Sequence, residues 1–270
     1  MKNVKPLPTL GVTPACAERN RNFRVGSGSG REQNMRRHYW NYLVTLAIVL
    51  VTFCSCAKPA TIPMPTPSPE QANIIKLPEP QYDSDVSIEQ SLLNRRSIRS
   101  YTGEPLTLQE VSQLLWAAQG ITNARGLRTA PSAGALYPLE VYIAAGDVKD
   151  LTTGVYRYEP DEHQLARIID GDKRAGLADA ALAQPCVKEG AIVIVFTAVY
   201  ERTTGKYGDR GIRYVHMEVG HAAQNLCLQA TAMGLGVVTV GAFNDGQVTK
   251  LLNLPQDEHP LYIIPVGRKQ

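Results

Sequence analysis

The stretch 214–236, YVHMEVGHAAQNLCLQATAMGLG, constrains the fold most, because it predicts one long amphipathic helix. Its apolar residues step by three or four positions, and glycines close it: Val215, Val219, Ala222, Leu226, Ala230 and Met233, then Gly234 and Gly236. A helix with a single apolar stripe has to pack that stripe against other elements. We therefore expect this helix to pack within the core of a globular domain.

The chain around this helix predicts a mixed α and β body of about 190 residues, enough for one domain, which we expect to begin at residue 82. Ser87 and Thr107 are placed to cap helices that carry Ile88, Leu92 and Leu93 and residues 108–119. A further helix is expected over 173–183, and strands over 141–146, a hairpin at 154–169, 191–199, 237–241 and 261–267. The predicted fold class is α+β.

The N-terminal part predicts export. Residues 1–34 have no apolar periodicity and are expected to be a disordered extension or a start-site artefact. Residues 35–57 combine two arginines with the apolar run Leu43–Cys54, which predicts a signal peptide or a membrane anchor, with Cys56 as a candidate lipidation site. Residues 58–81 are proline-rich and predict an extended linker. The expected location is the cell envelope, periplasmic or on the outer surface, with a possible lipid anchor at Cys56.

Charge and cysteine patterns exclude several function classes. Residues 1–58 hold nine Lys and Arg against two Asp and Glu, whereas the remaining chain holds nineteen against twenty-three, so the body is mildly acidic and offers no nucleic-acid footprint. Cys227 is expected to be a buried thiol, with a disulfide to Cys186 as the alternative. His216 and His221 are five apart rather than four, so no metal site is predicted.

The segment RRSIRSY, residues 95–101, follows the predicted end of a helix, where cations are stabilised by the helix dipole. A solvated helix end is therefore one interpretation. The other is a phosphate site, because arginine can bind two phosphate oxygens at once and serine adds a hydroxyl. A phosphate site would need a pocket for the rest of the ligand, and the loop APSAGALYP, residues 130–138, has the small residues and walls to form one.

Four ordered motifs make residues 88–267 resemble the FMN-dependent nitroreductase family: RRSIRSY, APSAGALYPLEVY, KYGDRGIRYVHMEVGHAAQNLCLQATAMGLG and LYIIPVGR. Within that family the chain is most similar to the SagB-type and thiazoline/oxazoline oxidase branch. The resemblance implies a nitroreductase-like fold with a central, mostly antiparallel sheet flanked by helices. It also implies a homodimer with the long core helix at the dimer interface and FMN bound between the subunits.

The resemblance also implies roles for individual residues. It assigns one group to the FMN phosphate, ribityl chain and ring edge: Arg95, Arg96, Ser97 and Arg99. It places Ser132, Ala133 and Gly134 against the isoalloxazine ring and Gly241 near it. Arg268 is expected to reach the phosphate. Glu218 and Asn225 are expected to make helix-packing or dimer contacts.

Lys206 and Tyr207 match a Lys-Tyr pair linked to catalysis in the azoline-oxidising relatives. Hydride transfer to a flavin also requires removal of a proton, which a lysine or tyrosine with a lowered pKa can accept. The alternative is that Lys206 and Tyr207 are an exposed pair without a catalytic role, because TTGKYGDRG is expected to be a loop. The nearby Arg210 and Arg213 would bind an acidic substrate or cap the following helix. The resemblance implies a small-molecule or modified-peptide substrate, with NAD(P)H as a candidate donor. Two non-enzymatic readings stay open: a tethered flavin-binding module and a scaffold without cofactor.

Overall fold

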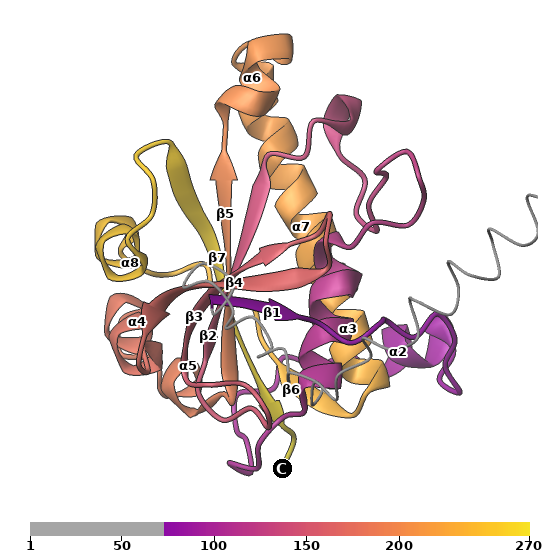
Figure 1. The fold of residues 1–270 in the computed structure, drawn as a ribbon, viewed down its shortest axis with the longest axis vertical. Coiled ribbons are helices and arrows are strands. Elements are labelled where there is room, and N and C mark those ends of the chain that lie inside the picture. The colour runs from indigo at the N-terminus through magenta and orange to yellow at the C-terminus, as the bar shows by residue number, and fades with distance from the viewer. Residues whose placement is uncertain (1–72) are drawn as a thin grey trace, which may run out of the picture. The chain divides into compact units, whose positions relative to one another are not determined.

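The computed structural model describes residues 73–270, which form a seven-stranded sheet with helices on both faces (Figure 1). The predicted extension, export segment and Cys56 lie outside the described residues, as does most of the linker. Every pair of neighbouring strands is antiparallel, and the order is β1-β4-β3-β2-β5-β7-β6. The strands are β1 (Ile74–Lys76), β2 (Leu139–Ala145), β3 (Gly154–Glu159), β4 (Gln164–Asp170), β5 (Ile192–Val199), β6 (Leu235–Val237) and β7 (Glu258–Arg268). The predicted central, antiparallel sheet flanked by helices is confirmed.

Helices cover the sheet on both sides. One face carries α2 (Ile88–Asn94), α3 (Leu108–Gln119) and α7 (Arg210–Ala232), and the other carries α4 (Arg174–Ala180), α5 (Pro185–Glu189) and α8 (Asp245–Leu252). The helix α6 (Glu201–Tyr207) follows β5, and a short 3₁₀ turn, η2 (Ala133–Ala135), precedes β2. None of the helices in residues 73–270 is long and apolar enough to span a bilayer.

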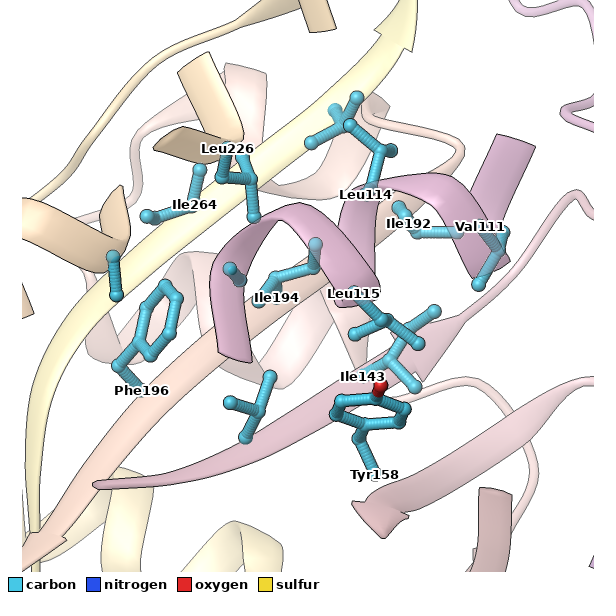
Figure 2. Close-up of a cluster of buried hydrophobic side chains, with 14 of the residues drawn as sticks. Val111, Leu114, Leu115, Ile143, Tyr158, Ile192, Ile194, Phe196, Leu226 and Ile264 are labelled. Carbon is cyan, nitrogen blue, oxygen red and sulfur yellow. The ribbon is translucent and has the colours of Figure 1, made fainter. Parts of the chain in front are cut away.

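Strand β5 shows how the two cores arise from one sequence pattern. Alternate side chains of a strand point to opposite faces, so Ile192, Ile194 and Phe196 pack with α3 and α7 (Figure 2). Val193 and Val195 pack with α4, α5 and α8. Because helices cover both faces, the strand is an unbroken apolar run rather than an alternating one.

The predicted helix starts are confirmed where a cap marks them. Ser87 accepts a hydrogen bond from the Gln90 amide, and Thr107 forms a reciprocal capping box with Glu110. The long helix α7 begins at Arg210, four residues before the predicted start at Tyr214. The prediction missed this first turn because the turn carries no apolar periodicity. Cys186 and Cys227 are both buried free thiols, as expected for Cys227.

Two expectations about the first part of the body are wrong. The linker does not extend to residue 81, because β1 pairs with β4 and Leu77 is only 3% exposed. Such a short strand is specified by its partner rather than by its own pattern. The apolar residues of α2 do not face the core either: Ile88, Leu92 and Leu93 are all more than half exposed.

Three segments meet at a half-buried histidine. Tyr158 donates to His163 Nδ1 at 2.9 Å, while Nε2 lies 2.7 Å from Ser112 Oγ and 3.1 Å from the Pro78 carbonyl oxygen. Burial lowers the pKa of His163, so the neutral ring is the form that holds these contacts.

The contribution of His163 to the free energy of unfolding is therefore expected to fall as the pH drops below about 6.5, the unfolded histidine pKa, because the unfolded chain then binds a proton at this residue that the folded chain does not. Denaturant unfolding of the full chain between pH 5 and 8 measures this. The difference between the wild type and His163→Gln isolates this contribution and should shrink as the pH drops, whereas the same change at exposed His221 should not give that pH-dependent difference. Equal slopes in the two variants would contradict the prediction.

Candidate functional site

Arg95 and Ser97 line a pocket of about 150 Å³ beside α7. The segment carrying them leaves α2 at Arg95 and runs along β6, where the Ile98 amide donates to the Val237 carbonyl at 2.9 Å. An extended segment places alternate residues on one side, which brings Arg95 and Ser97 to the same wall. The other lining residues come from α7, from the end of β6 and the stretch after it, and from β7: Gly220, Ala223, Gln224, Cys227, Val237, Val238, Thr239 and Tyr262.

The remaining arginines of the predicted phosphate group lie elsewhere. Arg96 donates to the Leu93 and Arg95 carbonyls at 3.0 and 2.8 Å, so it caps the end of α2, as the helix-end interpretation predicts. Arg99 is exposed and does not line the pocket. Its charge acts instead on Cys186: burial raises the pKa of that thiol, and the Arg99 charge opposes the shift.

Arg268 forms a two-point ion pair with Glu110 at 2.6 and 2.9 Å, at the capped start of α3. It does not line the Arg95 pocket either. Its guanidinium is therefore already bound to a carboxylate, and phosphate binding by Arg268 stays a prediction. Gly241 lies close to the pocket, since a Cβ added there would meet the Tyr262 ring at 3.6 Å.

The predicted ring-facing loop and the predicted catalytic pair meet at Gly134. A Cβ added at Gly134 would lie 2.8 Å from Tyr207 Oη and 2.9 Å from Lys206 Nζ, and its φ of +65° favours glycine. Lys206 and Tyr207 end the helix α6, so the expectation of a loop over TTGKYGDRG is wrong. The helix ends at Gly208, whose φ is +56°. Residues about 70 positions apart thus converge, as the resemblance implies but no local pattern shows.

The surroundings of this pair are aromatic and basic. Tyr207 packs edge-on against Tyr214 at 5.2 Å between ring centroids, and Arg210 lies over the Tyr214 ring. Lys206 Nζ lies 5.3 Å from the centroid of the Tyr207 ring, and within residues 73–270 neither Nζ nor Tyr207 Oη has a hydrogen-bond partner on another side chain. Both groups are therefore available to a bound molecule.

Glu218 is a site residue whose position the sequence reasoning missed. It was expected to make helix-packing or dimer contacts, but it accepts a hydrogen bond from Ser132 Oγ at 2.5 Å and is only 2% exposed. Burial raises its pKa to about 7, opposed by the Ser132 bond and the Arg128 charge. Its spacing from Val215 and Ala222 places it on the buried stripe of α7, a signal that could have found it. Asn225, two turns on, donates to the Thr129 carbonyl at 3.2 Å.

The Arg95 pocket and the cluster around Gly134, formed with Lys206 and Tyr207, lie on different sides of α7. Glu218 points to the loop at Ser132, whereas Gly220 lines the Arg95 pocket. Two residues along a helix turn the side-chain direction by about 200°. Within the described chain, the predicted phosphate residues and the Gly134 cluster are therefore not parts of one pocket.

The antiparallel sheet flanked by helices is the fold of a known class of oxidoreductases. The family model described as Nitroreductase family matches residues 92–268, so the chain belongs to the nitroreductase family. It is 50% identical over 195 residues to a protein of Methanocaldococcus jannaschii named as a nitroreductase, covering 72% of this chain and 96% of that one. A nitroreductase structure from Anabaena variabilis superposes with a TM-score of 0.65 at 35% identity, over 73% of this chain and 42% of that chain.

More distant relatives have two kinds of names. One is the FMN reductase (NADPH) of Bacillus subtilis, 24% identical over 66% of this chain and 64% of its own length. Another is the microcin B17-processing protein McbC of Escherichia coli, 28% identical over 56% of this chain and 58% of its own length. The chain thus spans only part of these relatives.

Proposed function

We propose that the protein is an FMN-dependent oxidoreductase in which Lys206 and Tyr207 handle a proton beside the loop at Gly134. The observation that carries the proposal is the convergence of both polar groups on Gly134, where an added Cβ would lie 2.8 Å from Tyr207 Oη and 2.9 Å from Lys206 Nζ. Two such ionisable groups, without a partner on another side chain, can exchange a proton with a bound molecule. The FMN reductase among the relatives supports the choice of cofactor.

The described residues fit this cofactor. Arg95 and Ser97 supply guanidinium and hydroxyl donors to one small pocket, the donor set that suits a phosphate. When bound, FMN takes up two electrons as a hydride and gives them up in a second half-reaction. This chain's part is to hold the phosphate at Arg95, to keep bulk away at Gly134 and to accept a proton at Lys206 Nζ or Tyr207 Oη.

We further propose a homodimer in which a second copy completes the site. Within one chain, α7 separates the Arg95 pocket from the group formed by Gly134, Lys206 and Tyr207. In the dimer, a second α7 packed against the first brings the partner's Gly134 group to each Arg95 pocket. Gly220 lies exposed in the middle of this helix, with open space around its Cβ position, which suits the close approach of another helix. The exposed apolar residues of α2 offer surface to cover.

The SagB-type assignment is the finer proposal, and two substrate classes divide it. The likeness to a microcin-processing protein, together with the Lys-Tyr pair, favours a modified peptide whose azoline ring is oxidised. The likeness to FMN reductases favours NAD(P)H as donor and a small acceptor. Steady-state assays with NADPH and with a thiazoline-bearing peptide separate the two. Export to the cell envelope and lipidation at Cys56 stay proposals from the sequence, and fractionation with a Cys56→Ser variant tests them.

The first test of the proposed function is the visible spectrum of the purified full chain. A yellow protein that releases FMN is the expected result. Arg95→Ala and Ser97→Ala should each weaken FMN binding by about 10- to 100-fold, because each removes a bond to a charged group. The exposed loop residue Arg125 gives a matched arginine control that should bind FMN normally.

Three outcomes are informative. A colourless chain that refuses added FMN would contradict the proposal and leave the scaffold reading. FMN binding without turnover on any donor would identify the non-catalytic module. Wild-type affinity in Arg95→Ala would show that the phosphate is held elsewhere.

A further inference from the structure

Glu218 is buried without the partners that a buried carboxylate needs. One oxygen accepts the Ser132 hydroxyl, while Oε1 is buried and has no hydrogen-bond partner in the described structure. Leaving a buried charged group half-satisfied costs free energy. A carboxyl retained at such a position, on a helix that otherwise buries alanine, valine and leucine, indicates a role other than packing.

The groups around Glu218 do not neutralise it. Arg128, on the loop before η2, is the charged group that acts on it, but its guanidinium donates to Gln119 at 2.9 Å and stacks over the Tyr137 ring. From α6, Lys206 and Tyr207 reach Gly134, which lies in η2 two residues after Ser132. The carboxyl therefore has one strong link, to Ser132.

Ser132 in turn fixes the loop. Its Oγ donates to Glu218 and accepts from the Tyr137 amide at 2.9 Å, so one hydroxyl joins α7 to both ends of the turn 132–137. In this arrangement the hydroxyl proton is directed at Glu218 and a lone pair of the same oxygen faces the Tyr137 amide.

We propose that Glu218 is a positioning residue whose ionised carboxylate, through Ser132, fixes the loop 132–137 on which Lys206 and Tyr207 converge. The 2.5 Å separation is that of a hydroxyl bonded to a carboxylate. Protonation replaces this charge-assisted bond with a weaker neutral one. Because burial raises the pKa of Glu218 to about 7, the loop is held above that pH and loosens below it.

Hydrogen exchange of the Tyr137 amide in the cofactor-free full chain tests the proposal. Its protection factor, corrected for intrinsic exchange, is expected to fall about fivefold from pH 8 to pH 6, the difference between a charge-assisted and a neutral hydrogen bond. Glu218→Gln should remove this dependence. Glu258→Gln is the matched control: Glu258 is another buried carboxylate, held by the hydroxyls of Tyr142 and Thr197, and its loss should leave the dependence intact.

A second variant keeps the test decisive if Glu218→Gln fails to fold. In Ser132→Ala the reporter becomes the Ala135 amide, which donates to the Ser132 backbone carbonyl at 3.1 Å, and its protection should not vary with pH. If the protection of the Tyr137 amide did not change with pH in the wild type, the proposal would be overturned. An unchanged pH dependence in Glu218→Gln or Ser132→Ala would overturn it as well. The loop's relevance to cofactor binding rests on the proposed function, but the exchange measurement needs no FMN, so the two can fail separately.

Discussion

Lys206→Ala is expected to lower kcat by about 10²- to 10⁴-fold, the usual contribution of a positioned general acid or base. Tyr207→Phe removes only a hydroxyl and tests the second candidate for the same role. The cause of the loss would be a missing proton acceptor beside Gly134, where both groups lie within contact distance of the added Cβ position. Steady-state turnover with saturating donor measures the effect.

Two checks make this result interpretable. The bound-flavin content should be unchanged in both variants, because neither residue lines the Arg95 pocket. Lys188→Ala, at an exposed lysine near the end of α5, is the matched control and should turn over normally. Full activity in both Lys206→Ala and Tyr207→Phe would mean that the pair is structural and that the proton goes elsewhere.

The parts of the fold that the sequence predicted are those encoded locally. The hairpin of β3 and β4, the capped start of α3 at Thr107 and the buried strand β5 each follow from a spacing or a cap within a few residues. The apolar stripe of α7 was predicted for the same reason.

The errors arise where tertiary contacts decide. The strand β1 is three residues long and exists because β4 offers an edge. Helix α6 ends in glycine, lysine and tyrosine without an apolar stripe, so nothing local distinguishes it from a loop. The outward face of α2 could not be predicted from amphipathicity, which shows that one side is apolar but not what covers it.

For the site, the sequence predicted residue types better than their grouping. RRSIRSY contains both one wall of a pocket, at Arg95 and Ser97, and a helix cap, at Arg96, because alternate residues of an extended segment face opposite ways. The separation of the two clusters across α7 depends on the angle between Glu218 and Gly220. The sequence gives this angle, but only the folded chain shows that Glu218 contacts Ser132 and that Gly220 lines the Arg95 pocket.

Phe196→Ala is expected to destabilise the folded chain by about 3–5 kcal/mol, from lost burial and the cavity left behind. The ring is fully buried on β5, beneath α7 and beside Leu226 and Ile264 (Figure 2). Such a loss is a large share of a typical stability of about 5–15 kcal/mol. Urea unfolding of the full chain measures it as a lower midpoint at a similar slope.

Phe243 offers a control of the same residue type. It is only partly buried against the other core, so Phe243→Ala should cost clearly less. Equal losses would mean that the core between β5 and α7 is not the more tightly packed of the two. Because this core supports α7, which carries Glu218 and one wall of the Arg95 pocket, a destabilised Phe196→Ala chain should also bind FMN less tightly at temperatures near its unfolding transition. Below that transition the folded fraction should bind normally, which separates loss of fold from loss of site.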